Sequence, residues 1–313
     1  MTSTTRRTTR TRLILASAAS TSICLLPAMT PGAAHAAVTT TSRGTAARAA
    51  SAAAVTVAGP AAAMRRHGVG RFTHPLAVTN RFLPLVPGTR FRYEGRVSGE
   101  GPHVEVFTVS DLTLKIHGVP VVVVLDEDYR SGKLEEAELA FFAQDDAGNV
   151  WNLGEHPEEF ENGRFTGAPS TWIDRVHKAA GGFKLPARPR LGQTWTEGRS
   201  AAIDFLDVSR VAKVRTTARS GLGLHRGVLE VDETSPLDLT SGHQLKFYAP
   251  HIGLVRVEAR GGDAQETLTL VTVSHLGRRA MAGVRSTVRT MDRRGRTVSA
   301  DYRTVGPLRV RCR

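Results

Sequence analysis

The middle of the chain alternates apolar and polar residues with a period of two, which is the pattern of half-buried antiparallel strands. Segment 253–260 (GLVRVEAR) shows it, with Arg256 and Glu258 between apolar positions. Segment 121–125 is instead continuously apolar, which predicts a central strand covered on both faces. The pattern predicts strands at 90–97, 103–110, 119–129, 139–144, 193–199, 208–218, 227–233, 243–249, 253–260 and 267–274.

Glycine-containing connectors separate these segments at intervals of about ten residues. We therefore expect a mainly β fold, a single antiparallel meander sheet that is curved or half-barrel-like. No strand alternates with a long amphipathic helix, which argues against a doubly wound α/β fold. Segment 154–191 is the least regular part, and we expect a loop-rich excursion there with a short helix around 171–180.

The stretch FFAQDDAGNVWNLGE at 141–155 is the segment that most resembles a metal-binding loop. Counted from Asp145 as an EF-hand loop, glycine falls at the fourth position instead of the sixth, and His156 occupies the place of the final glutamate. A hairpin explains the residues better, with Gly148 at positive φ and Asp145 accepting backbone hydrogen bonds.

The N-terminal end has the three parts of a secretory signal peptide. Four arginines and no acid occupy the first twelve residues, an apolar run covers 13–29, and Ala34 and Ala36 flank His35. We predict a signal peptide at 1–36 with cleavage after Ala36, and an uncleaved anchor is the alternative. No later stretch is long enough to span a membrane, so the mature chain is expected without a transmembrane segment, secreted or associated with the cell wall.

The net charge of +13 is concentrated at the two ends. Segment 1–71 has nine arginines and no acid, segment 277–313 has eleven arginines and two aspartates, and segment 72–276 carries 22 basic and 27 acidic residues. We expect a disordered Ala/Thr/Arg linker at 37–71, an antiparallel β domain at 72–276 and a basic, mostly disordered tail at 277–313.

This distribution bears on partners. A nucleic-acid-binding domain carries its positive charge on its folded face, and here the folded part is mildly acidic, so no nucleic-acid partner is expected. The basic ends could attract an anionic wall polymer or lipid headgroups, although the excess of arginine is also typical of a GC-rich genome. If Cys24 leaves with the signal peptide, Cys312 is the remaining thiol, and neither an internal disulfide nor a zinc site built on paired cysteines is expected.

The candidate chemistry in the middle segment is sparse. Asp126 and Asp128 end a strand and share one face, so they are weak candidates for a metal site, with a solvent-facing strand end as the alternative. The cluster at 155–161, which contains His156, is interpreted as a solvated loop. No nucleotide-binding, zinc-protease or serine-hydrolase motif occurs, so we expect no cofactor, metal or assigned catalytic residue.

Several aromatic residues could line an apolar cavity inside a curved sheet, or pack as ordinary core. These residues are Phe141, Phe142, Trp151, Trp172, Trp195, Phe247 and Tyr248.

Several motifs resemble a family of secreted or surface β-rich proteins of actinobacterial type that has no known activity. They are NRFLPLVPGTRFRYEG (80–95), VVVLDEDYRSGKLEEAELAFFAQDDAGNVWNLGE (122–155), ENG (161–163), LPARPRLGQTW (185–195) and ETSPLDLTSGHQLKFYAPHIGLVRVE (233–258). The resemblance implies a shared secreted β domain and assigns no functional residue. This chain departs from the family pattern at Arg81, Phe82, Asn152, Leu185 and His251.

These observations predict an exported, non-enzymatic binding or envelope-associated module that holds an apolar small molecule or lipid. Two alternatives remain at this point. One is a secreted hydrolase whose active site has no sequence signature, and the other is a structural wall-associated protein that uses its basic ends.

Overall fold

The computed structural model describes residues 70–238, 240–263 and 265–311. The predicted signal peptide with its cleavage site at Ala36, the linker up to residue 69, and Cys312 lie outside the described residues. The strands are β1 (Thr89–Val97), β2 (Gly101–Ile116), β3 (Val119–Arg130), β4 (Lys133–Gln144), β5 (Val150–Glu161), β6 (Arg164–Gly167), β7 (Trp172–Ile173), β8 (Ala180–Leu185), β9 (Thr194–Ser200), β10 (Phe205–Ser220), β11 (Gly223–Thr234), β12 (His243–Ala249), β13 (Gly253–Arg260), β14 (Glu266–His275) and β15 (Arg309–Val310). The helices are α2 (Arg278–Val298) and the 3-10 helices η1 (Ala201–Ile203) and η2 (Tyr302–Thr304).

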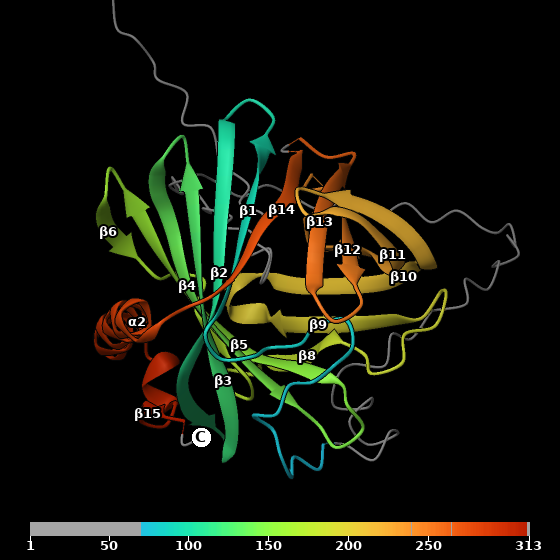
Figure 1. Ribbon diagram of the computed structural model, residues 1–313. Helices are drawn as coiled ribbons and strands as arrows, with labels where there is room; N and C mark the ends of the chain where they lie inside the picture. The colour runs from blue at the N-terminus through green and yellow to red at the C-terminus, as the bar shows by residue number, and fades with distance from the viewer. Residues whose placement is uncertain (1–69, 239, 264, 312–313) are drawn as a thin grey trace, which may run out of the picture.

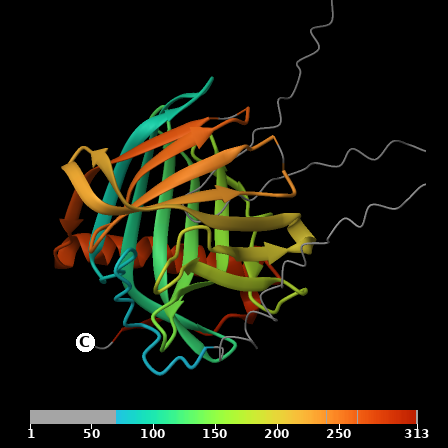
Figure 2. The ribbon, with the colours of Figure 1, turned by 90° about the vertical axis from the view of Figure 1, so that its right-hand side faces the viewer.

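The sheet closes on itself, because β1 pairs with β14 on one side and with β2 on the other. The resulting barrel has twelve strands in the order β1-β14-β13-β12-β11-β10-β9-β8-β5-β4-β3-β2, and all pairings are antiparallel (Figures 1 and 2). The mainly β, antiparallel prediction is confirmed. The prediction of an open or half-barrel sheet is wrong, because Phe91 of β1 pairs both with Phe107 of β2 and with Val273 of β14. Val273 is far from Phe91 in the sequence, so the local pattern does not reveal this pairing.

Strand β3 has a hydrophobic environment on both faces. Val122 and Val124 point into the core inside the barrel, while Val121, Val123 and Leu125 belong to a second core outside it. All five side chains are buried. The prediction of a central strand covered on both faces is therefore confirmed.

Helix α2 forms the outer cover of this second core (Figure 1). Met281, Val284, Val288 and Met291 recur at intervals of three or four residues, which places them on one side of a helix, and all four are buried. Two ion pairs hold the helix to the barrel, one from Arg285 to Asp111 and one from Arg294 to Glu158. The expectation of a mostly disordered tail is thus wrong for the segment that forms α2, because its thin apolar stripe finds an apolar partner on the barrel wall.

Segment 154–191 also differs from the prediction. Strand β5 continues through Pro157 to Glu161, and β6, β7 and β8 follow where a loop-rich excursion was expected. The predicted short helix around 171–180 is absent from this described segment, which contains β7, turns and the first residue of β8. The strand pattern was hidden because buried charged residues interrupt the apolar alternation of β5.

The predicted hairpin at 141–155 is confirmed. Gly148 has φ of 89°, and the Asp145 carboxylate accepts the Asn149 backbone N–H at 2.8 Å and the Trp151 Nε1–H at 2.9 Å. The hairpin also anchors the segment that precedes β1, because the Asp146 carboxylate accepts the Thr73 backbone N–H at 2.8 Å. This segment crosses one end of the barrel (Figure 1).

Candidate functional site

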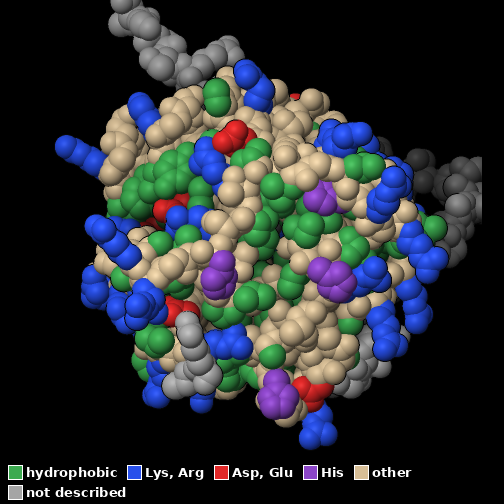
Figure 3. All heavy atoms as spheres, in the orientation of Figure 1, with side chains coloured by type: hydrophobic (Ala, Val, Ile, Leu, Met, Phe, Trp, Pro, Cys, Tyr) green, Lys and Arg blue, Asp and Glu red, His purple; other side chains and the backbone are tan. Residues whose placement is uncertain are grey.

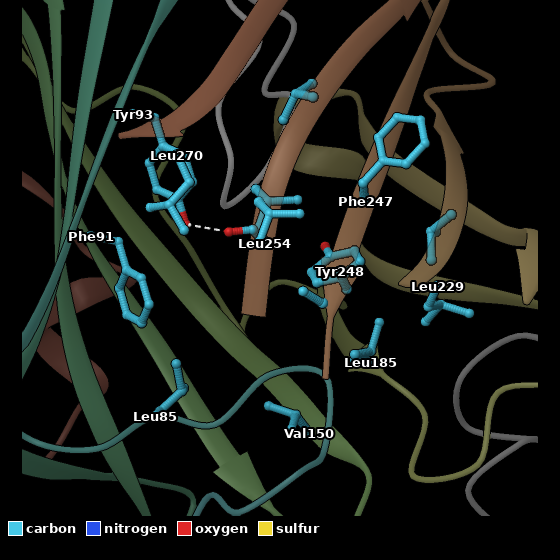
Figure 4. Close-up of a cluster of buried hydrophobic side chains, with 14 of the residues drawn as sticks. Leu85, Phe91, Tyr93, Val150, Leu185, Leu229, Phe247, Tyr248, Leu254 and Leu270 are labelled. Carbon is cyan, nitrogen blue, oxygen red and sulfur yellow. Dashed lines mark hydrogen bonds between the residues drawn. The ribbon is translucent and has the colours of Figure 1, made fainter. Parts of the chain in front are cut away.

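The barrel wall has a weak seam between β13 and β14. Two residue pairs join the strands there, Arg256 with Thr269 and Val257 with Leu268, and the two strands then diverge. The Tyr93 hydroxyl donates a hydrogen bond across the gap to the Leu254 carbonyl at 3.1 Å (Figure 4). The seam places side chains of β1 opposite those of β12 and β13.

A narrow apolar slot lies at this seam. Its lining is Leu83, Pro84, Leu85, Phe91, Tyr93, Phe107, Phe142, Lys184, Tyr248, Ile252, Gly253 and Leu254. The space free of atoms, including its open mouth, is about 450 Å³, but the centre of a water molecule can reach only about 30 Å³ of it. Most of the slot is therefore too narrow for a water molecule. Figure 4 shows Phe91 and Tyr93 facing Tyr248 and Leu254, with Leu85 from the preceding segment at one end.

The structure brings only part of the predicted aromatic set to this slot. Phe142 and Tyr248 line it, and Trp195 and Phe247 belong to the same hydrophobic cluster without lining the slot. The other three aromatic residues lie elsewhere: Phe141 and Trp151 in the outer core beneath α2, and Trp172 in a third small cluster. Phe91, Tyr93 and Phe107 were not nominated, although their alternation on two strands placed them on one face.

A belt of buried ionic residues occupies the barrel interior beside the slot. Lys184 Nζ donates to Glu197 Oε2 at 2.5 Å, and Lys246 Nζ donates to Glu233 Oε1 at 2.5 Å. Lys184 also lies 3.7 Å from Glu233, which links the two pairs. Burial alone would raise the pKa of Glu233, but Lys246 and Lys184 outweigh it and lower the pKa to about 2. Burial and the charge of Glu233 raise the pKa of Glu197 to about 7.

Asp126 and Asp128 share the inner face of β3, as alternation predicted, but they are buried and not at a solvent-facing strand end. Asp128 Oδ1 lies 2.7 Å from His103 Nε2, and Glu266 Oε1 lies 2.8 Å from His103 Nδ1. Burial disfavours the charged imidazole, but these two carboxylates raise the pKa of His103 to about 9. Among the described residues, no group of three or more His, Cys, Asp or Glu is arranged to hold a metal ion.

Asp126 interacts directly with the carboxyl group of Glu105. Burial raises the pKa of Asp126 to about 7, the neighbouring Glu105 carboxyl group opposes this, and the charge of Asp128 adds to it. Burial and the charge of Asp126 also raise the pKa of Glu105 well above its usual range. Both carboxyl groups therefore keep their protons to a higher pH in the folded protein than in the unfolded chain.

We expect Asp126→Asn to stabilise the protein in a pH-dependent way. The pKa of Asp126 rises from an ordinary value of 3.8 in the unfolded chain to about 7 in the fold, so folding takes up a proton between these values, and stability falls as pH rises through that window. The amide cannot ionise. The free energy of unfolding of the variant should therefore match that of the parent near pH 4 and exceed it by about 2–4 kcal/mol near pH 8. Urea unfolding at pH 4, 6 and 8 measures the difference.

The matched control is Asp263→Asn, in an exposed loop after β13. Its unfolding free energy should run parallel to that of the parent at all three pH values. An Asp126→Asn variant that differs from the parent by the same amount at pH 4 and pH 8 would contradict the raised pKa.

The acidic segment at 155–161 is not a solvated loop, because Glu155, His156 and Glu158 lie within β5 and are buried. His156 Nδ1 lies 2.8 Å from Thr171 Oγ1, and its ring packs against Tyr302 with 4.4 Å between the ring centroids. These residues join the barrel to the C-terminal segment, and none of them lines the slot.

A serine lies next to a histidine at the tip of the β10–β11 hairpin. Ser220 Oγ is 2.7 Å from His225 Nε2 and accepts the Leu222 backbone N–H at 3.1 Å. The contacts close the turn, and neither side chain lines the slot. This pair therefore gives the hydrolase alternative no support.

No family model matches the chain, and no curated protein matches it significantly. Among solved structures, it is similar to a candidate exported protein with a YmcC-like fold from Bacteroides fragilis, at 15% identity and a TM-score of 0.37. It is also similar to a candidate lipoprotein from Parabacteroides distasonis, at 14% identity and a TM-score of 0.30. Each similarity covers 62% of this chain and 99% of the other. At these TM-scores the similarities carry no argument about function.

In the part of the chain that the structure describes, no helix combines the length and the apolar content that crossing a bilayer requires.

Proposed function

We propose that this protein is an exported, non-enzymatic binding module that holds the apolar part of a small molecule or lipid in the slot between β1 and β13. The observation that supports the proposal is the concentration of aromatic rings around a thin, open space. The rings belong to Phe91, Tyr93, Phe107, Phe142 and Tyr248. Ligand sites are typically concave and mostly apolar, with few polar groups.

The dimensions and charge of the slot favour an acyl chain or a flat ring. The volume that the centre of a water molecule can reach is only about 30 Å³, so a ligand must part the lining side chains, and a slender or flat group requires the smallest opening. Among the described residues that line the slot, Lys184 is the one with a charged side chain. The carboxylates of Glu197 and Glu233 already neutralise this charge. The slot therefore offers dispersion contacts and apolar burial, and no uncompensated charge for an ionic headgroup.

The proposal of export rests on the N-terminal sequence, where a basic start, an apolar run and small residues at Ala34 and Ala36 have the order of a signal peptide. After cleavage the chain would be secreted or retained at the cell envelope, where apolar molecules need a carrier in an aqueous surrounding. Tightly bound cofactors and catalytic residues play no part in this function.

Leu83→Trp should abolish binding by filling the slot. Leu83 is half-buried in the slot wall, so an indole ring there would occupy the thin space. We expect the parent to bind the uncharged, rod-shaped dye 1,6-diphenyl-1,3,5-hexatriene with a rise in fluorescence, and the variant to bind at least tenfold more weakly. Native mass spectrometry of the protein from a secreting host should show an added mass that disappears on denaturation.

The matched control is Leu191→Trp, at a leucine that is 67% exposed and outside the slot lining. It should bind the dye as the parent does. Equal binding by both tryptophan variants would place the dye outside the slot. The proposed function would be overturned if the parent protein bound no dye and also showed no added mass after incubation with a lipid extract.

A further inference from the structure

A second hollow lies on the outside of the barrel, where α2 begins. Its lining is Val86, Pro87, Gly88, Asp111, His275, Leu276, Arg278, Met281, Arg285, Val310 and Arg311. The centre of a water molecule can reach about 610 Å³ of this hollow, which is about twenty times the corresponding volume in the apolar slot. Backbone hydrogen bonds from Leu276 to Gly88 at 2.8 Å and from Arg311 to Asp111 at 2.8 Å hold its walls together. We call this hollow the basic groove.

The lining of the basic groove has an excess of positive charge. Three arginines face a single acid, Asp111, and that acid is already bound by Arg285, whose Nε lies 2.9 Å from Asp111 Oδ1. The contact with Arg285 lowers the pKa of Asp111, so this pair stays ionised and neutral overall. Arg278 and Arg311 then remain as cations in the lining.

The positive charge continues from the groove along α2. Arg289 and Arg293 are exposed and lie one helical turn apart, on the side of the helix opposite its buried residues. With a rise of 1.5 Å per residue, the arginines from 278 to 293 cover about 22 Å. Figure 3 shows Lys and Arg side chains on the side of the molecule where α2 lies and also on the opposite side. A linear array of cations fits an extended polyanion better than a single small anion.

The apolar residues of the groove distinguish between kinds of polyanion. They are aliphatic, and the imidazole of His275 is the one aromatic ring among the described residues of the lining, which include no Phe, Tyr or Trp. Proteins that bind single-stranded nucleic acids stack successive bases on several aromatic side chains, and a single imidazole does not provide such a series. Arginine guanidinium groups instead match phosphate oxygens in geometry and charge.

We propose that the basic groove and the exposed face of α2 bind a linear phosphodiester polymer without bases. Arg278 and Arg311 contact phosphate groups in the groove, and Arg289 and Arg293 contact the polymer as it continues along the helix. This site is separate from the apolar slot, so either can fail without the other.

The test compares two double variants of the full chain, so that the basic N-terminal segment 1–71 is the same in both. Arg278→Ala/Arg311→Ala removes the groove cations, and Arg210→Ala/Arg226→Ala removes two exposed arginines on β10 and β11. The probe is purified poly(glycerol phosphate), with binding measured by calorimetry at 50, 100 and 200 mM salt. We expect the groove variant to bind at least tenfold more weakly than the control variant. For the groove variant, the slope of log Kd against the logarithm of the salt concentration should also be smaller by about one to two.

Three comparators decide the nature of the ligand. Inorganic phosphate and vesicles of anionic phosphatidylglycerol should bind weakly, and single-stranded DNA of equal charge should bind more weakly than the polymer. Equal binding by the two double variants would overturn the proposal, and so would DNA binding as tight as polymer binding. Tight binding of inorganic phosphate with no gain from the polymer would overturn it in favour of a single-anion site, and a preference for vesicles would overturn it in favour of a membrane surface. Thermal unfolding of both variants, which change surface residues, should match the parent.

Discussion

Val288→Asp should destabilise the whole barrel by at least about 4 kcal/mol, because the change removes a buried apolar side chain and buries a carboxylate without a partner. Val288 is fully buried between α2 and the outer face of the sheet. Folded domains are stable by only about 5–15 kcal/mol, so the variant should be unfolded or aggregated at 37 °C. Circular dichroism and urea unfolding at pH 5.5 measure the loss.

Thr287→Asp is the matched control, because it introduces the same charge one residue earlier on the exposed side of α2. It should change the free energy of unfolding by less than about 0.5 kcal/mol. Equal stability of the Val288→Asp and Thr287→Asp variants would mean that α2 contributes nothing to the barrel, as expected of a disordered tail.

Lys246→Met should cost about 3–5 kcal/mol at pH 7.5, because it leaves the buried carboxylate of Glu233 without its closest cation. Glu233 Oε1 lies 2.5 Å from Lys246 Nζ, and both side chains are almost fully buried. Without Lys246 the pKa of Glu233 should rise from about 2, because the effect of burial then meets less opposition. The loss should therefore shrink as the pH falls and Glu233 becomes protonated.

The double variant Lys246→Met/Glu233→Gln should recover at least half of this loss, because no unpaired charge remains in the interior. Lys213→Met serves as control on neighbouring strands. Lys213 pairs with Glu230 at 2.8 Å, but its side chain is 62% exposed, so its loss should cost less than about 1 kcal/mol. Urea unfolding that shows the same cost for Lys246→Met and Lys213→Met would contradict the ionic belt.

The charged residues of the barrel interior show why sequence reasoning missed most of the site. Alternation correctly placed Asp126 and Asp128 on one face of β3, but polar residues on one face of a strand are expected to face water. Here that face points inward, because charges that pair with others inside the barrel can be buried. The partner His103 lies on β2, and nothing in the local pattern relates the two.

The slot could not be predicted from the sequence for a similar reason. Phe91 and Tyr248 are 157 positions apart, and they meet only because β1 and β14 close the barrel while β13 and β14 diverge. The aromatic residues nominated from composition were therefore divided among three separate cores.

By itself, the sequence determined the β class, the strands with regular alternation, the doubly covered strand at 121–125 and the hairpin at 141–155. These features depend on the period of the side chains and on turn residues, which are local. Only the tertiary structure decided the closure into a barrel, the ordered helix α2 and the inward direction of the charged face. These depend on contacts between distant segments, since a strand edge pairs with whichever strand is brought beside it, and a thin apolar stripe folds only where another surface covers it.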